Sequence, residues 1–491
     1  MVNSPADEFV YTYYNDDTSL AAHHYNASGI IPEPTPGFTR VILVILLRIG
    51  YVLIHVGSVP VNNINLILLQ NIVDVCWVTI SYCLIGYLIA YNGGSNGIVG
   101  DGLWIGDPTA DKDEALIGWA AAVVAAAICT CGIVGRTHTI GYLATGLLLA
   151  GLTQPFLVHW AWTPHGWMKK HVLKETFVSF RDFAGSAVVH LVGGLSGMIG
   201  CMILGRRILR LSSIDDASLA TGTSGTVFAG QLLVFLGLQS LSMSHEKFRF
   251  GHGGNVYLNN LLAASSCSVL VVAFHFTLTG EEFNHWTVMR CVQATVAGLA
   301  VVSAGADIYT PEMAICVGSI GSVIYFLVSK LVFQSALEDY CNIIATHVAC
   351  AFLGSLLAPL FAIERIDDTE TNLMRLYWQV ICLLTVVSMV SVIMYISFTL
   401  LEVLGFLRNR SEHLNHSRAA RAMAALDVPR RTFFQRLFQA DDDPVYIQPG
   451  TAVDSARRPS VGIHAMKYQA EDAAVEKGRV VEPRQTASQS L

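Results

Sequence analysis

The sequence predicts an all-α integral membrane protein, and three observations support this fold class. Of its 491 residues, 53% are apolar and only 14% are charged, and the mean hydropathy is positive. Apolar runs close to the roughly 20 residues that span a bilayer as a helix recur along the chain. These runs stop near residue 404, where the composition becomes polar. A soluble chain of this length would need far more charged surface, so the lipid bilayer is the expected partner of most of the surface.

Counting the apolar runs of spanning length predicts eleven transmembrane helices. Because eleven is odd, the two ends of the chain are expected on opposite sides of the membrane. The predicted helices occupy residues 39–59, 64–91, 115–135, 138–161, 182–205, 219–243, 256–277, 286–305, 310–333, 340–363 and 374–404.

Charge and a glycosylation sequon indicate the orientation. Residues 1–38 lack the basic and apolar regions of a cleaved signal peptide, and Asn26 lies in a sequon, which fits an extracellular N-terminal segment. The positive-inside rule makes the opposite side cytoplasmic, although a basic loop at 163–181 on the predicted outside runs against it. We therefore expect a multi-pass protein of the plasma membrane. The basic residues on the predicted cytoplasmic side are Arg136, Arg206, Arg207, Arg210, Lys330, Arg408, Arg410, Arg418, Arg421, Arg430 and Arg431.

The chain after the first segment divides into three parts by composition. Residues 39–404 form the predicted transmembrane domain. Residues 405–440 are rich in Arg and Ala and are expected to form a basic cytoplasmic segment. Residues 441–491 carry too little apolar surface to build a core and are expected to be a disordered cytoplasmic tail.

Several classes of function find no support in the sequence. The net charge of −7, without a basic stripe, gives no nucleic-acid footprint. The eleven cysteines show no disulfide framework, and Cys129-x-Cys131 has no second pair or His at zinc spacing, so we expect no metal and no other cofactor. A hydrolase is not excluded by residue type, since His, Asp and Ser occur in the spans. Because the Gly-x-Ser-x-Gly, His-Glu-x-x-His and nucleotide-loop patterns are absent, we predict that the protein is not an enzyme.

Ionisable side chains inside the predicted spans are the most informative residues, because they are costly in lipid and usually face a bundle interior or a pore. A single His there is more often explained by a hydrogen bond between helices. The segment from Asp182 to Gly194 is more specific, because small residues before and after His190 allow close helix packing around it. The ionisable residues are Arg48, His55, Asp74, Asp182, His190, His275, Asp307 and His347.

The segment Asp182–Gly194 closely resembles the fifth-span signature of the ammonium transporter/Rh family, in its ammonium-transporter form. Other parts of residues 39–440 resemble the family as well. They are Pro155–Trp162 at the end of the fourth span, Asn62, Asn63, Asn71 and Asp74 at the second, Tyr91–Gly97 beyond it, and Glu338, Asp339, Asn342, His347 and Gly354 in the tenth.

This resemblance implies a homotrimer in which each protomer holds a pore, with two inverted five-helix repeats and with His190 and His347 lining the lumen. It implies that Trp162 recruits ammonium outside, where cation–π attraction is worth about 0.5–2 kcal/mol. Asp182 is then a structural acid near the vestibule. Ammonium or ammonia is the implied substrate. A neutral imidazole with an ordinary pKa near 6.5 suits the relay of the proton that is separated from ammonia.

The sequence departs from the family at the pore entrance. The positions of the two stacked Phe rings that gate the family's pore fall at Ala125 and Leu241. The serine that assists Trp162 aligns with His245, and Ser244 beside it is the alternative. Arg48 adds a base to the first span, which is expected to repel cations unless a carboxylate such as Asp74 pairs with it.

These departures leave two functions open. If the histidines and Trp162 suffice, the protein transports ammonium or ammonia through an entrance wider than is usual in the family. If the Phe rings are required, it is a non-conducting ammonium sensor or regulatory subunit of the same fold, acting through its long basic C-terminus.

Overall fold

A computed structural model gives the fold, and it describes residues 36–58, 64–91, 96–205, 217–243, 253–279, 285–335, 337, 339–361 and 369–409. Nine helices in this part of the chain are long and apolar enough to cross a membrane. Two shorter apolar helices, Ser224–Leu238 and Thr287–Val302, fall on the sixth and eighth predicted spans. The prediction of an all-α, multi-pass membrane protein is therefore confirmed, whereas the count of eleven crossings stays a prediction. Asn26, Ser244, His245, Glu338 and the tail beyond Asn409 lie outside the described residues.

The helices follow the apolar runs of the sequence, and several contain a π-helical turn, labelled η. The elements are α3 (Pro36–Ser58), α4 (Ile64–Ser81), η1 (Tyr82–Gly86), α5 (Tyr87–Ala90), α6 (Lys112–Ile133), α7 (Thr139–Leu148), η2 (Leu149–Thr153), α8 (Gln154–Trp162), β1 (His171–Leu173), β2 (Thr176–Val178), η3 (Ser186–Leu191), α9 (Val192–Leu204), α10 (Ala217–Leu238), α11 (Gly253–Leu278), α12 (His285–Val302), α13 (Pro311–Gln334), η5 (Ile344–Ala349), α14 (Cys350–Phe361) and α15 (Thr369–Val403).

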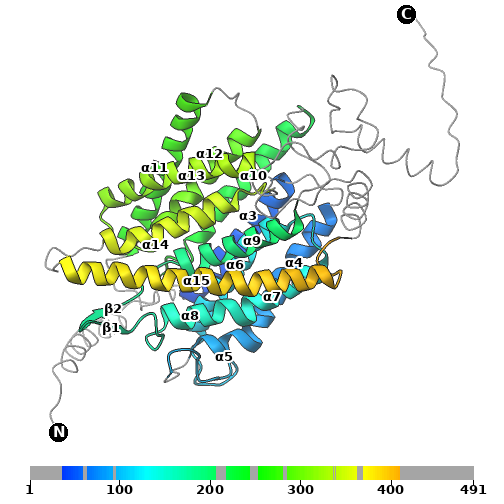
Figure 1. Cartoon of the computed structure of the whole chain (residues 1–491). Helices are drawn as coiled ribbons and strands as arrows, with labels where there is room; N and C mark the ends of the chain where they lie inside the picture. Colours follow the sequence, from blue (N-terminus) through cyan, green and yellow to red (C-terminus); the bar gives the residue numbers. More distant parts are fainter. Residues whose placement is uncertain are drawn as a thin grey trace, which may run out of the picture.

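The bundle has two halves joined along its middle (Figure 1). The blue to teal helices up to α9 form one half, and the green helices α10 to α14 form the other. Helix α15 runs across the front of the bundle and packs against α9 and α14. Its 35 residues make it about 50 Å long, more than the roughly 30 Å of a hydrocarbon core, so it must tilt or project from the membrane.

Small residues place α6 and the η3–α9 helix at the centre of the molecule. In the apolar stretches of these two helices 89% and 83% of residues are buried, against 28% in α11 and in α15. A Cβ on Gly132 of α6 would lie 2.2 Å from the carbonyl oxygen of Gly197 of α9. Only glycine permits this approach, so the backbones of α6 and α9 come into contact.

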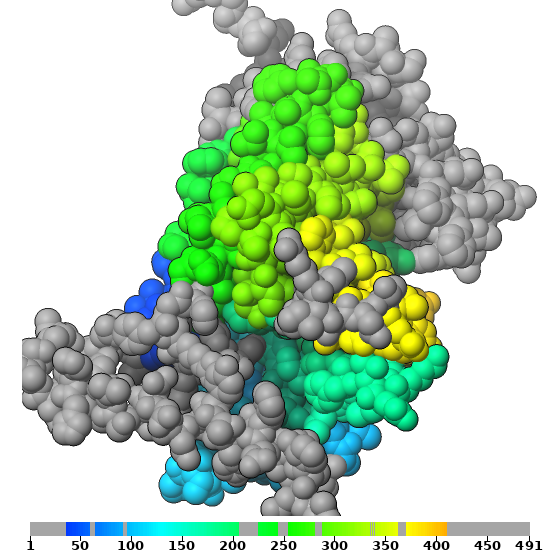
Figure 2. Space-filling view, turned by 90° about the vertical axis from the view of Figure 1, so that its left-hand side faces the viewer, coloured from blue at the N-terminus to red at the C-terminus, as the bar shows by residue number. Residues whose placement is uncertain are grey.

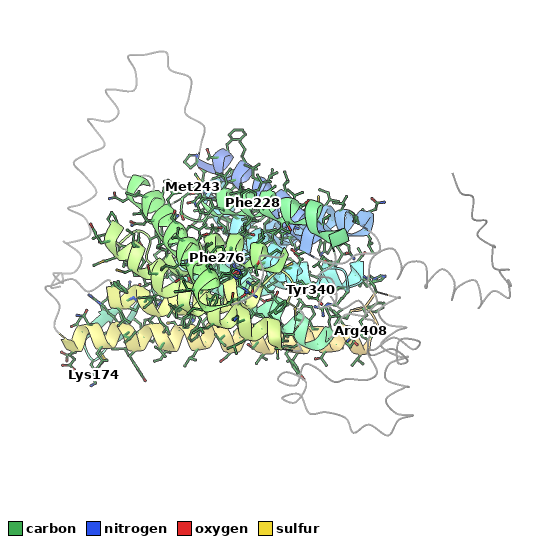
Figure 3. The ribbon with its side chains drawn as sticks, turned by 90° about the horizontal axis from the view of Figure 1, so that it is seen from above. Lys174, Phe228, Met243, Phe276, Tyr340 and Arg408 are labelled. Carbon is green, nitrogen blue, oxygen red and sulfur yellow. The ribbon has the colours of Figure 1, made fainter. Side chains whose placement is uncertain are left out.

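The loops gather at two opposite faces, which we name after one residue on each. The Trp162 face carries residues 96–111 and 163–185, and the Arg136 face carries residues 134–138 and 405–409. Lys174 and Arg408 mark these two ends of the molecule in Figure 3.

The basic loop at 163–181 contains an antiparallel hairpin, β1–β2, that the sequence analysis did not predict. The hairpin lies beside the start of α15 on the Trp162 face (Figure 2). The ring of His171 stacks on Trp378 of α15 at 4.1 Å between centroids, and Trp378 Nε1 donates to the carbonyl of Met168. These contacts hold the loop 163–181 against α15, which the basic composition of the loop did not predict.

Candidate functional site

The two histidines singled out in the sequence meet at the centre of the bundle. Nδ1 of His190 lies 3.1 Å from Nδ1 of His347, and the two rings are nearly parallel, with 11° between their planes. Both side chains are buried, at 1% and 3% exposure. One of the two nitrogens must carry the shared proton, so the pair presents a donor and an acceptor within an apolar interior.

His190 is positioned by the turn that precedes its helix. Gly185 has a φ of +82°, a left-handed conformation that favours glycine, and the π-helical turn η3 begins at the next residue. The Asp182 carboxylate accepts hydrogen bonds from the backbone N–H groups of Ala187 and Val188, both at 2.9 Å. The predicted span was 182–205, but the helix begins at Ser186. The reason is that Asp182 lies before the helix and caps its first backbone N–H groups.

His347 is held in a matching way from the opposite face. Asp339 lies eight residues before His347, as Asp182 lies eight residues before His190. Its Oδ2 accepts from the N–H of Ile344 at 2.8 Å, at the start of the π-helical turn η5. Burial raises the pKa of both carboxyls, to about 6 in each case, against the backbone hydrogen bonds that favour the charged form.

A glycine lets the two histidine-bearing helices come together. A Cβ on Gly194 would lie 3.0 Å from the Cβ and the carbonyl carbon of His347, and another on Gly193 would lie 2.7 Å from the carbonyl oxygen of Ala125. Gly194 therefore allows α9 to pack closely against His347, and Gly193 allows it to pack closely against Ala125 of α6.

Trp162 lies at the end of α8, half-buried, close to the start of η3. Its Nε1 donates to the carbonyl oxygen of Asp182 at 2.8 Å, and its ring would lie 3.3 Å from a Cβ on Gly185. The indole is thus fixed beside the acid that caps the helix of His190. A half-buried indole beside a carboxyl can attract a cation on the Trp162 face.

The two positions at which the family resemblance places gating Phe rings are both buried. Ala125 is fully buried in α6, and Leu241 is 6% exposed just after α10. Neither carries an aromatic ring.

Tyr51 of α3 is a site residue that the sequence analysis missed. Its hydroxyl lies 3.3 Å from Nε2 of His347, and its side chain is 3% exposed. The signal was available, because Tyr51 follows Arg48 by three residues and precedes His55 by four, which puts all three on one helix face.

Arg48 and His55 both contact polar partners inside the bundle. Arg48 Nη2 lies 2.7 Å from Oδ2 of Asp74, and it also donates to the carbonyl of Asn71. The Nδ2 of Asn71 lies 3.2 Å from Nδ1 of His55, and Nε2 of His55 lies 3.2 Å from Sγ of Cys131. An amide nitrogen can only donate, so His55 is the neutral tautomer that carries its proton on Nε2. The positive charge that Arg48 adds to the first span is neutralised by its ion pair with Asp74.

Comparisons with proteins of known sequence agree with one another. The model of the Ammonium Transporter Family matches residues 38–419. Ammonium transporter 1 member 3 of Solanum lycopersicum is 27% identical over 405 residues, which are 75% of this chain and 87% of that protein. Ammonium transporter 1 member 1 of Arabidopsis thaliana is 27% identical over 417 residues, 79% of this chain and 82% of that protein.

Solved structures share the fold at lower sequence identity. A Sensor Amt Protein superposes with a TM-score of 0.65 at 22% identity, covering 77% of this chain and 94% of its own. Mep2 of Saccharomyces cerevisiae superposes with a TM-score of 0.63 at 17% identity, covering 76% and 88%. Since the family model matches most of its length, this chain belongs to the ammonium transporter family.

Proposed function

We propose that this protein conducts ammonium or ammonia across the membrane through a pore in which His190 and His347 form the central polar element. The observation that carries the proposal is the 3.1 Å contact between their Nδ1 atoms, with both side chains buried in the bundle. The relatives named ammonium transporters, at about 27% identity over most of this chain, support the same substrate. Transport rather than catalysis is the activity we assign.

The route begins at the Trp162 face. Moving a bare ammonium ion from water into a medium of low dielectric costs a prohibitive free energy unless other groups replace its hydration water. Trp162 supplies an aromatic face, and Asp182, fixed beneath it by two backbone hydrogen bonds, supplies negative potential when it is ionised. Beyond them the histidine pair accepts the proton of ammonium or passes ammonia between a donor and an acceptor.

The assembly and its placement belong to the same proposal. We assign a homotrimer in the plasma membrane with the Trp162 face outside, in line with the family resemblance and with the basic residues Arg136 and Arg408 on the other face.

A second candidate is a non-conducting sensor or regulatory subunit. The absence of rings at Ala125 and Leu241 favours it, because the family resemblance places the two gating Phe rings at these positions.

Uptake of labelled methylammonium separates the two candidates. The full chain is expressed in cells that lack their own ammonium transporters, and its presence at the surface is measured in the same cells. Transport predicts uptake that saturates and that unlabelled ammonium inhibits. Uptake equal to that of empty cells, with the protein at the surface, would leave only the sensor.

A further inference from the structure

We infer that the hairpin β1–β2 binds the headgroups of anionic phospholipids at the membrane surface of the Trp162 face, through Lys170, Lys174 and the apolar side chains between them. This binding is independent of the proposed transport. The basic loop 163–181, which contains the hairpin, has no part in the proposed pore, and its charge runs against the positive-inside rule.

One side of the hairpin exposes both positive charge and apolar surface. Val172 and Phe177 lie directly opposite each other across the two strands, and they are 60% and 57% exposed. Lys170 and Lys174 are exposed too, each two residues from Val172, so the alternation of a strand puts them on the side of Val172. We call this set the Val172 surface; it consists of Lys170, Val172, Lys174 and Phe177.

The other side of the hairpin contacts α15. The ring of His171 stacks on Trp378 with 2° between the planes, and Val178 is buried. Trp378 also donates a hydrogen bond to the carbonyl of Met168, just before the hairpin. The hairpin is thus attached to α15 by one side, which leaves the Val172 surface pointing away from the helix.

Aromatic side chains place the hairpin at the level where a membrane meets water. Tyr377, beside the stacked Trp378, is 57% exposed. Trp and Tyr are enriched at this level of membrane proteins, because their rings are apolar and carry a polar N–H or O–H group. A chain of ring contacts, with centroids 5.7 to 6.0 Å apart, links four residues at this end of the bundle: Phe156, Trp160, Trp167 and Trp378. The Val172 surface therefore lies at the level of lipid headgroups.

The charge of the loop selects the chemistry of the lipid. Residues 169–175 contain three lysines and one acid, Glu175, whereas the loop 96–111 on the same face contains three aspartates and neither Lys nor Arg. Lysines near a membrane surface are attracted by anionic lipids, while apolar neighbours enter the headgroup layer. The phosphate groups of anionic phospholipids are therefore the partner that matches the Val172 surface.

The turn of the hairpin holds its lysine at a conformational cost. Lys174 and Glu175 have φ angles of +44° and +69°, in the left-handed region that Gly or Asn usually occupies in two-residue hairpin turns. Lys174 lies at one end of α15 in Figure 3. A charged side chain is thus kept at a position where glycine would fit with less strain.

The hairpin leads directly into the segment that caps the helix of His190. The N–H of Phe180 donates to the carbonyl of Met168 at 2.8 Å, and the side chain of Gln379 in α15 bonds to both the N–H and the carbonyl of Arg181. Asp182 is the next residue. A lipid bound to the Val172 surface therefore stabilises the outer edge of the segment that positions Asp182.

Hydrogen exchange of the full chain in lipid nanodiscs tests the contact. Two compositions are compared, phosphatidylcholine alone and an equal mixture of phosphatidylcholine and phosphatidylglycerol. The peptide that covers residues 169–178 should exchange more slowly in the mixture, and added salt should remove the difference because it screens the charges. The acidic loop 96–111 on the same face is the internal control and should show no slowing.

Variants at the turn test the role of charge without touching the bundle. Lys174→Gln should lose about fivefold of the slowing, the factor that one lysine contributes near an anionic surface. Glu175→Gln changes the adjacent residue in the opposite sense and should increase the slowing. Equal effects of Lys174→Gln and Glu175→Gln would overturn a contact with anionic lipid.

Two further results would also overturn the inference. One is exchange of residues 169–178 at the same rate in both compositions. The other is protection that ignores lipid charge and disappears when the assembled protein is dissociated into single chains, which would assign the Val172 surface to a second copy of the chain. The exchange measurement needs no transport, so it remains decisive even if the transport proposal fails.

Discussion

Arg48 and Asp74 form an ion pair inside the bundle, with Nη2 of Arg48 2.7 Å from Oδ2 of Asp74 and side-chain exposures of 7% and 1%. A charge in this position cannot be solvated by water, so each partner depends on the other. The pair turns a base that would repel ammonium into a neutral contact between α3 and α4.

Removing one partner of this pair is therefore expected to destabilise the fold strongly. Asp74→Asn should lower the stability by about 3–5 kcal/mol, because Arg48 is left as an unpaired buried charge. The melting temperature of the purified protein in detergent measures the effect. The double variant Arg48→Gln/Asp74→Asn, which removes both charges, should recover most of the loss. Equal melting temperatures for wild type and Asp74→Asn would show that the pair carries no such dependence.

The raised pKa of Asp182 predicts a pH dependence of uptake. Burial raises this pKa to about 6, so the carboxyl becomes protonated as the pH on the Trp162 face falls through 6. The negative potential that draws ammonium is then lost, whereas ammonium itself stays protonated over this range. Uptake should fall between pH 7 and pH 5 in the wild type. For stability the sign is opposite, because a raised carboxyl pKa favours the folded state most at low pH, an advantage lost as the pH rises through 6.

The matching variant removes this titration. Asp182→Asn should take up less methylammonium at pH 7 and lose the decline toward pH 5. Asp107→Asn changes an acid on the same face that is exposed to solvent, and it should keep the pH profile of the wild type. A pH profile of Asp182→Asn that equals the wild-type profile would assign the dependence to another group.

The close approach of α6 and α9 predicts a steric effect at Gly132. Gly132→Ala would place a Cβ 2.2 Å from the backbone oxygen of Gly197, so the helices must separate, at a cost of about 1–3 kcal/mol. Gly225→Ala in α10 meets no atom within 4 Å and should leave the melting temperature unchanged or slightly higher. A similar melting temperature for the two variants would mean that α6 and α9 adjust without cost.

A Phe ring at position 241, where the family resemblance places one of the two gating rings, should sharpen selection by size. In Leu241→Phe the larger side chain narrows the buried position that Leu241 fills, and methylammonium, which is larger than ammonium, should be slowed more. Leu236→Phe, on the exposed side of α10, is the control and should leave both rates alone. Competition between labelled methylammonium and unlabelled ammonium gives the ratio. A ratio unchanged in Leu241→Phe would place the selective point elsewhere in the pore.

Apolar run length predicted the fold class, and the family resemblance implied the pairing of His190 with His347. The sequence left open whether Arg48 repels cations or is paired with a carboxylate, and the structure shows that it pairs with Asp74. These two residues are 26 positions apart on different helices, so spacing along one helix does not reveal their contact. The hairpin β1–β2 was missed because its stability comes from the stacking of His171 on Trp378, a distant residue. The contact of Tyr51 with His347 was missed for the same reason, although the helix face of Arg48 and His55 pointed to Tyr51.

The most direct test of the central claim is methylammonium uptake by His190→Ala and His347→Ala in cells without other ammonium transporters. Each variant removes one imidazole of the 3.1 Å pair. Each should abolish uptake or change its selectivity between ammonium and methylammonium, while Cys129→Ala, a small buried change beside the pair's helix, should behave as the wild type. Uptake by both histidine variants at the wild-type rate and selectivity, at equal surface amounts, would contradict a pore built on these two residues.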